Sequence, residues 1–221
     1  YLQAVFVEMF GEPGRNTRES NEYEICNVLS KVRNGIQTGP FGSSLKKHEY
    51  VPTGIPVWGI NNLRDNEFVE DDPLFITNEK YNKLKKYSVE HGDVLVSRAG
   101  TVGKMCVASP SRFPSIIGTN LVRISLDTSL ITPEYFVHLF NYFGDSFNNL
   151  KMTNDENAYS FINPSVLKSF RIPIPALKAQ NEYINAVRGY ERLRCQQREA
   201  ERQAEMLFQG LLEGAFGGVE G

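Results

Sequence analysis

Apolar residues along the chain follow several different spacings, and each spacing predicts a different kind of structure. Residues 1–10 carry apolar side chains three and four positions apart, which is the period of an amphipathic helix. The "GEPGRN" that follows should end this helix, because glycine caps a helix C-terminus and proline cannot continue one. The side chains of the apolar stripe are Leu2, Val5, Phe6, Met9 and Phe10.

From Gly35 to Thr128, short runs rich in β-forming residues alternate with glycine and proline. The runs are "IPVWGI", "DVLVSRA", "KMCVA" and "NLVRISL", a pattern typical of a mainly β domain with many turns. Helical spacing interrupts it after Thr77, a plausible N-cap, and follows it after Thr132, where Pro133 takes the first helical position. With a short helix near Pro164 and the strand "SFRIPIP", the pattern predicts one globular domain over residues 13–175.

The spacing changes again between residues 176 and 216, where the chain has no proline. A heptad pattern predicts one helix of about 40 residues, which spans roughly 60 Å at 1.5 Å per residue. So long a helix cannot bury its stripe on a domain of this size, so we expect a coiled coil with a second long helix. Gln197 either fixes the register or is a tolerated polar residue. The expected helix interface comprises Tyr183, Ala186, Tyr190, Leu193, Gln197, Ala200, Ala204, Leu207 and Leu211.

The two predicted helical ends of the chain resemble each other. Laid without gaps, "QAVF" at residues 3–6 falls on "QGLL" at residues 209–212, and "FG" at residues 10–11 falls on "FG" at residues 216–217. Either residues 1–12 are the end of a preceding helix of the same kind, or two amphipathic helix ends match by chance. In both cases the fold class is α+β, with a mainly β globular domain followed by a long helix.

Composition indicates an ordinary globular protein and narrows its environment. The chain has 221 residues, of which 41% are apolar and 23% are charged. No apolar run approaches the length of about 18 residues that a membrane helix needs, so no membrane association is expected. Cys26, Cys106 and Cys195 are odd in number and lack CxxC spacing, which argues for a reducing compartment and against a zinc site. We expect a cytoplasmic protein.

The net charge of −2 is not typical of a nucleic-acid-binding protein, but its distribution is uneven. Residues 30–125 contain 13 Lys or Arg and nine Asp or Glu. A positive excess within the globular part is consistent with a surface that faces phosphates. The alternative is an uneven but solvated surface charge, which would have no functional meaning.

No sequence motif supports catalysis or a bound cofactor. "GTVGKM" fails as a phosphate-binding loop, because Arg98 and Met105 stand where that loop needs Gly and Ser or Thr. "DDPLF" lacks the second proline of the adenine methyltransferase loop and reads better as a turn. His48, His91 and His138 lie far apart without metal-ligand spacing. We therefore expect no enzyme, no metal and no cofactor bound by this chain.

Three landmarks in order resemble the specificity subunit of type I restriction–modification enzymes. They are "YVPTGIPVWGINNLRD" from Tyr50, "GDVLVS" from Gly92 with its Gly100–Lys104 turn, and "IPIPALKAQ" from Ile172, which leads into the long helix. The resemblance implies a target recognition domain followed by a conserved-region helix, which pairs antiparallel with a second copy or an upstream half. It further implies a non-catalytic module that reads one half of a bipartite DNA target. Its other partners would be methyltransferase and restriction subunits, with S-adenosylmethionine held by the methyltransferase.

Four polar stretches in turns and loops supply the side chains that such a domain would need. Lys and Arg bind phosphates, whereas Asn, Arg, Ser and Thr reach base edges. Asn61 and Asn62 could instead stabilise a turn by bonding to their own backbone. The expected DNA-binding residues are Ser43, Ser44, Lys46, Lys47, Asn61, Asn62, Arg64, Ser97, Arg98, Thr101, Lys104, Asn154, Asn157 and Tyr159.

Two other functions remain compatible with the sequence. The helix could dimerise while the β domain binds a protein, which the near-neutral charge favours. An unrecognised nuclease or methyltransferase is also conceivable, although no catalytic constellation supports it. A steep loss of affinity with salt would distinguish DNA binding from protein binding.

Overall fold

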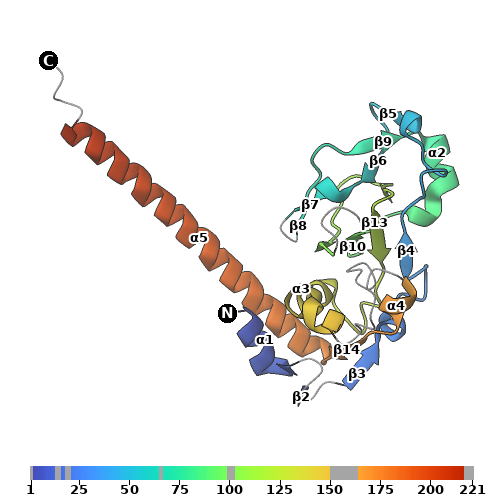
Figure 1. The fold of residues 1–221 in the computed structure, drawn as a ribbon, viewed down its shortest axis with the longest axis horizontal. Coiled ribbons are helices and arrows are strands. Elements are labelled where there is room, and N and C mark those ends of the chain that lie inside the picture. Colours follow the sequence, from blue (N-terminus) through green and yellow to red (C-terminus); the bar gives the residue numbers. More distant parts are fainter. Residues whose placement is uncertain are drawn as a thin grey trace.

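A globular part and a long projecting helix make up the chain (Figure 1). The computed structural model describes residues 2–12, 16–17, 21–64, 67–98, 103–149 and 164–216. The helices are α1 (Leu2–Phe10), α2 (Asn78–Leu84), α3 (Pro133–Asn149), α4 (Pro164–Lys168) and α5 (Leu177–Phe216). The strands are β1 (Gly11–Glu12), β2 (Asn16–Thr17), β3 (Asn21–Glu24), β4 (Ile36–Thr38), β5 (Tyr50–Val51), β6 (Ile55–Trp58), β7 (Leu63–Arg64), β8 (Glu67–Phe68), β9 (Leu74–Ile76), β10 (Val94–Ser97), β11 (Met105–Val107), β12 (Ile116–Ile117), β13 (Leu121–Ile124) and β14 (Arg171–Ile174).

A four-stranded antiparallel sheet, in the order β11-β10-β13-β4, separates two hydrophobic cores. Side chains alternate between the two faces of a strand. Val94 and Val96 of β10 accordingly join a core shared with the helices, while Leu95 between them joins a core shared with the second sheet. A strand covered on both faces needs apolar residues at consecutive positions, which explains the "VLV" run.

The second sheet has the order β12-β6-β9-β5. Trp58, the last residue of β6, is fully buried. Its β6 and β12 run parallel, whereas β9 is antiparallel to both β6 and β5. The predicted strand in "IPVWGI" is confirmed as β6. The predicted N-cap Thr77 is confirmed as well, since its hydroxyl accepts a hydrogen bond from the backbone N–H of Lys80 at 3.2 Å.

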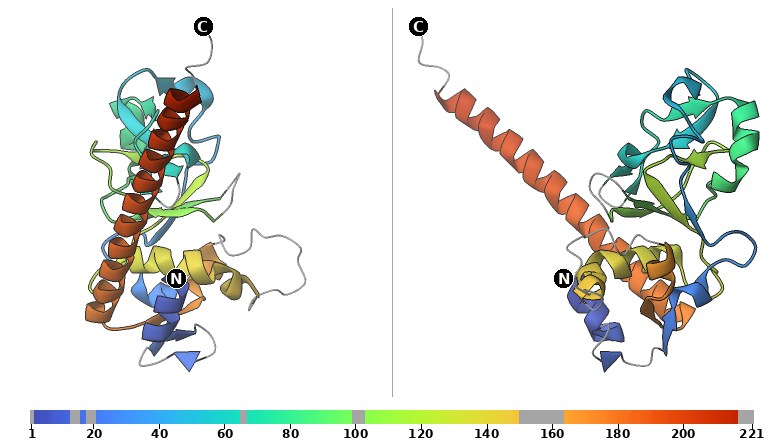
Figure 2. Two further views of the ribbon diagram at one scale, coloured as in Figure 1. Left: turned by 90° about the vertical axis from the view of Figure 1, so that its left-hand side faces the viewer. Right: turned by 45° about the vertical axis from the view of Figure 1, so that its right-hand side comes forward.

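Aromatic rings join α1, α3 and the first turns of α5 into one core. Phe6 and Phe10 of α1 pack against Tyr183 of α5, with ring centroids 5.4 and 5.7 Å apart. Tyr135 of α3 completes the group at 5.8 Å from Phe6. The pairing of β3 with β14 brings both ends of the domain together at this point. The helices α1 and α5 therefore leave from the same place and run in opposite directions (Figures 1 and 2).

The helix α5 is covered only at its base. Gln180, Tyr183, Ile184 and Val187 are buried there, whereas the side chains of residues 191–212 are all exposed. The amide of Gln180 fixes this base, because it accepts from the N–H of Thr132 at 2.8 Å and donates to two backbone carbonyls at 2.8 and 3.0 Å. Figure 2 shows the rest of the helix extending away from the globular part.

At the start of the expected helix interface, Tyr183 packs against α1, and the role of Ala186 stays a prediction. Tyr183 is fully buried inside this chain's own core, and Ala186 is exposed. The covered face of the helix base therefore follows residues 180, 183, 184 and 187, because α1 and α3 approach from that side. Tyr190 is partly buried against the same core. The remaining expected interface residues, Leu193, Gln197, Ala200, Ala204, Leu207 and Leu211, lie on the exposed part of α5.

Candidate nucleic-acid interface

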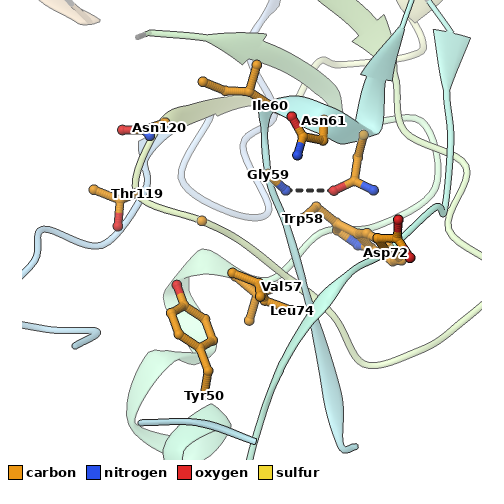
Figure 3. A pocket seen from close by; sticks show the side chains of 12 residues that line it. Tyr50, Val57, Trp58, Gly59, Ile60, Asn61, Asp72, Leu74, Thr119 and Asn120 are labelled. Atoms are coloured by element: carbon orange, nitrogen blue, oxygen red, sulfur yellow. Dashed lines mark hydrogen bonds between the residues drawn. The ribbon is translucent and has the colours of Figure 1, made fainter. Parts of the chain in front are cut away.

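Two loops leave the same edge of the second sheet because β6 and β12 are parallel neighbours. Trp58 pairs with Ile117 in the register, and the N–H of Gly118 donates to the carbonyl of Trp58 at 2.8 Å. The segments 59–61 and 118–120 follow these paired residues and emerge side by side. Asn61 and Asn120 each stand three positions after the pair and line one cavity (Figure 3).

A third loop lies against the same edge through Gly39. Its N–H donates to the carbonyl of Leu121 at 2.9 Å. A Cβ atom at Gly39 would lie 1.9 Å from the carbonyl oxygen of Gly118, so no other residue fits without moving the backbone. This close approach places the loop that begins at Gly39, with its exposed residues Phe41 and Ser43, at the same edge.

Arg98 at the end of β10 joins these loops. Its backbone N–H donates to the carbonyl of Asn120 at 2.9 Å. Its guanidinium carbon lies 5.5 Å from the ring centroid of Phe41, a cation–π contact. Among the described residues, no carboxylate pairs with this guanidinium, so its charge remains available to an anion or a base edge.

We call this surface the loop edge. It contains side chains from loops that are far apart in the sequence, and a cavity of about 350 Å³ is lined by three of them, Asn61, Thr119 and Asn120. Apolar side chains such as Val57, Ile60 and Leu74 form part of its wall, and polar groups form the rest (Figure 3). The loop edge consists of Phe41, Ser43, Asn61, Arg98, Thr119 and Asn120.

Six of the expected DNA-binding residues form two groups, three side chains at the loop edge and three exposed lysines. Ser43, Asn61 and Arg98 belong to the loop edge, and the half-buried Ser44 is in the Gly39 loop. Lys46 and Lys47 follow in the same segment and are exposed, as is Lys104 across the turn from β10. In the described part of the chain these three lysines have no ion-pair partner, which suits them to phosphate contacts.

Asn62 and Ser97 are corrections, because both side chains are buried and engaged within the chain. The Asn62 oxygen accepts from the N–H of Gly59 at 2.8 Å, and its amide donates to the carbonyls of Val69 and Asp71 at 2.8 and 3.0 Å. Figure 3 shows the first of these bonds. The Ser97 hydroxyl accepts from the N–H of Lys104 at 3.0 Å. Neither side chain is presented to a DNA groove.

Arg64 is exposed, as expected, but its charge is already paired. One of its guanidinium nitrogens lies 2.7 Å from a carboxylate oxygen of Asp71. Exposed ion pairs of this kind contribute little stability, yet they reduce the attraction of the arginine for a phosphate. The expected residues Thr101, Asn154, Asn157 and Tyr159 lie outside the described residues.

Sequence reasoning missed Phe41, Thr119 and Asn120. Asn120 stands directly before the strand "LVRIS" and resembles an ordinary turn residue. Only the parallel pairing of β6 with β12 shows that it lies beside Asn61, and that pairing joins segments about 60 residues apart. Phe41 gave no signal, because a lone aromatic residue in a glycine-rich loop has no period.

The ion pair between Glu49 and Lys80 determines which lysines near the Gly39 loop are unpaired. Glu49 accepts from the N–H of Lys46 and pairs with Lys80 at 2.6 Å. The backbone hydrogen bond, followed by Lys80, lowers the pKa of this carboxyl, so Glu49 stays ionised but is matched by Lys80. Glu49 therefore forms its ion pair with Lys80, and the side chains of Lys46 and Lys47 are exposed to solvent.

A buried ionic cluster lies in and beside the four-stranded sheet β11-β10-β13-β4. Arg123 is 1% exposed and donates to backbone carbonyls of Asn34 and Ser88. Burial lowers its pKa to about 10, and burial raises the pKa of Asp93, which accepts from Ser125 at 2.5 Å. These groups bond to this chain's own backbone and side chains, so the cluster has a structural role.

The residues that the structure describes contain neither a metal-binding cluster nor a membrane-spanning helix. No group of three or more His, Cys, Asp or Glu side chains within these ranges could hold a metal ion. Among the helices described, none is both long and apolar enough to span a bilayer.

Comparison with known proteins agrees with the fold and the sequence landmarks. A family model described as "Type I restriction modification DNA specificity domain" matches residues 40–201. The "Putative type I restriction enzyme MjaX specificity subunit" of Methanocaldococcus jannaschii is 22% identical over 173 residues, which cover 77% of this chain and 39% of that protein. This chain therefore belongs to the family of type I restriction–modification DNA specificity domains, and the resemblance inferred from the sequence is confirmed.

Solved structures show the same fold. The HsdS subunit from Thermoanaerobacter tengcongensis matches with a TM-score of 0.64 and 19% identity, over 98% of this chain and 50% of the subunit. A chain from a structure of the type I R-M system matches with a TM-score of 0.68 and 21% identity, over 97% of this chain and 50% of that chain. The chain thus spans half or less of the length of the relatives it matches.

Proposed function

We propose that this chain is a DNA sequence-recognition module that reads one half of a bipartite target. The observation that carries the proposal is the loop edge, where Asn61, Arg98 and Asn120 converge from separate segments without carboxylate partners among the described residues. Groups that can both donate and accept hydrogen bonds are needed to distinguish base pairs in the major groove. Membership in the specificity-domain family supports the same role.

The side chains divide into two roles on this proposal. Lys46, Lys47 and Lys104 contact phosphates, which gives affinity for any sequence and strong salt dependence. The loop edge contacts bases, which gives sequence choice. Arg98→Ala should relax the choice of sequence, whereas Lys46→Ala should weaken binding to all sequences. Because Arg64 is paired with Asp71, we expect Arg64→Ala to have a smaller effect than Arg98→Ala.

The exposed part of α5 provides the assembly surface. Leu193, Leu207 and Leu211 are 66%, 70% and 73% exposed, and bare leucines at heptad spacing favour a helical partner. The helix α1 packs on the base of α5 and runs the opposite way (Figure 1). A helical segment leading into α1, or a second copy of α5, would lie antiparallel along this stripe.

The wider complex would supply the chemistry. On this proposal the assembled helices dock methyltransferase and restriction subunits, and S-adenosylmethionine is bound by the methyltransferase. We propose a non-catalytic role for this chain, since sequence and site offer groups that bind rather than react. Nuclease or methyl-transfer activity of the purified chain alone would contradict this assignment.

Selection from a random duplex library tests the proposal. The chain, together with its methyltransferase subunit, should enrich a motif of about three to five base pairs, the reach of one recognition module in the groove. No enrichment from an intact complex would contradict sequence recognition.

A second candidate function is a partner-binding module that dimerises through α5. The exposed leucine stripe and the net charge of −2 favour it. Salt dependence distinguishes the two functions, because neutralising several phosphates makes the affinity fall steeply with salt concentration. A flat salt response, together with no enriched motif, would favour the partner-binding function.

A further inference from the structure

We propose that Asn61 and Asn120 form a matched pair of specificity-determining side chains that read a base pair containing adenine. The inference rests on the proposed DNA-recognition function and names the residues and the base that carry it. It also gives a role to Asn120, which sequence reasoning did not select.

The register places the two asparagines at the same edge of the second sheet. Trp58 and Ile117 are partners in the parallel pair of β6 and β12. Asn61 and Asn120 each follow their partner by three residues, after Gly59 and Gly118 respectively. The two segments begin side by side at the ends of this parallel pair, and Asn61 then lies in a 3₁₀ turn. Both amides line the same cavity (Figure 3).

The amides of Asn61 and Asn120 are available for recognition, whereas the amide of the neighbouring Asn62 is not. Asn62 is 2% exposed and uses its oxygen and its amide hydrogens in three hydrogen bonds to the backbone. Asn61 and Asn120 are exposed, and neither side chain has a hydrogen-bond partner among the described residues. Asn62 shapes the turn, so Asn61 is not required for that purpose.

The surroundings of the two amides favour a base edge over a phosphate. Asp72 lines the same cavity, and its carboxylate would repel a phosphate group. The walls of the cavity combine apolar side chains, such as Val57, Ile60 and Leu74, with polar ones. The cavity therefore offers the amides of Asn61 and Asn120 together with apolar contact, and in the described part of the chain neither Arg98 nor a lysine lines it.

The chemistry of the amide selects the base. An asparagine side chain presents one acceptor and two donors, which match the N6 and N7 atoms of adenine in a two-bond contact. A carboxylate in the same place accepts only, and it matches the amino group of cytosine instead. Asn61→Asp and Asn120→Asp change almost nothing in size, so they test recognition rather than packing.

The experiment is a selection from random duplexes with the wild-type chain and its methyltransferase subunit, repeated with Asn61→Ala, Asn120→Ala and the two Asp variants. The wild type should enrich a motif with an A·T pair, and each Ala variant should lose the preference at that position alone. Affinity for the wild-type motif should fall about 5- to 150-fold, the range of one good base contact. The Asp variant of the asparagine that contacts adenine should shift that position toward cytosine.

Lys46→Ala is the matched control, because it should weaken all sequences equally and leave the motif unchanged. Thermal unfolding of each variant should match the wild type, since both asparagines are exposed and without partners among the described residues. A wild-type motif that persists in both Ala variants, or one without an A·T pair, would overturn the inference and leave the proposed function standing. A wild type without any motif would overturn both.

Discussion

The base and the outer part of α5 carry similar apolar side chains but lie in opposite environments. At the base, Tyr183, Ile184 and Val187 are at most 5% exposed, because α1 and α3 pack over them. Further out, Leu193, Leu207 and Leu211 are each more than half exposed.

The contrast shows what a helical period does and does not determine. The spacing of apolar residues determines that a face will be covered, and the rest of the fold determines what covers it. At the base the covering elements belong to the same chain. On the outer part, burying a leucine against a partner would contribute about 1.5–3 kcal/mol relative to leaving it exposed, so a second helix has a strong reason to bind there.

Tyr183→Ala should show the largest difference between the two regions. The substitution leaves a cavity among the rings of Phe6, Phe10 and Tyr135, and truncating a buried aromatic side chain costs about 3–5 kcal/mol. Urea unfolding of the purified chain measures this loss. Leu193→Ala is the control, and we expect it to stay within about 0.5 kcal/mol of the wild type. Equal losses in the two variants would remove the distinction.

Replacing one glutamine in each region compares the contribution of its hydrogen bonds to the free energy of unfolding. Gln180→Leu should lower the free energy of unfolding by about 1–3 kcal/mol, because it leaves the backbone groups of Thr132, Leu130 and Pro175 without the partner that the buried Gln180 amide provides. Gln197→Leu should not destabilise the chain, since Gln197 is exposed and bonds only to Glu201 on its own helix among the described residues. A neutral Gln180→Leu would show that this amide does not fix the base.

Leu207→Ala tests whether a helical partner covers the outer stripe. We expect the chain to self-associate through α5, and the substitution should weaken this association about tenfold, or about 1.4 kcal/mol. Sedimentation equilibrium at several concentrations measures the effect, while urea unfolding at low concentration should remain unchanged. A wild type that is strictly monomeric at high micromolar concentration would contradict the expectation.

The smallest effect is expected at Glu191, where the covered and bare parts of α5 meet. Glu191 is exposed, but partial desolvation of its carboxyl, followed by the charge of Glu67, raises the pKa above its ordinary value of 4.5. The folded state therefore holds the Glu191 proton more tightly than the unfolded state, and the resulting destabilisation develops as pH rises through 4.5 and the raised pKa. Glu191→Gln should be slightly more stable than the wild type near neutral pH and equal to it in acid. Thermal unfolding at several pH values should show this, and an advantage confined to acid would contradict it.

Local elements were predictable from the sequence, whereas the grouping of the site was not. The long helix was expected over residues 176–216 and is found at Leu177–Phe216, because a helical period and the absence of proline are local signals. The juxtaposition of Asn61 with Asn120 depends on a long-range parallel pairing that no period encodes. Asn61 and Asn62 are adjacent and identical, yet one is exposed and the other is buried, a difference that a short 3₁₀ turn imposes.

Similar reasoning explains why the heptad pattern alone does not say which element covers each position of the helix interface. The heptad pattern assigned both Tyr183 and Leu207 to the expected helix interface, because each falls at one of the two interface positions of the heptad. Only the tertiary structure shows that Phe6 and Phe10 already cover Tyr183. The family resemblance was accessible from the sequence because its landmarks are short motifs in a fixed order.

The most direct test of the account is one duplex selection performed with two proteins, the wild-type chain and a Leu207→Lys, Leu211→Lys variant, each with its methyltransferase subunit. The account predicts that the wild type enriches a motif occurring twice at a fixed spacing. The variant should enrich the same motif once, because it keeps the loop edge but loses the helix partner. Enrichment of no motif by either intact complex would contradict the claim that this chain reads DNA sequence.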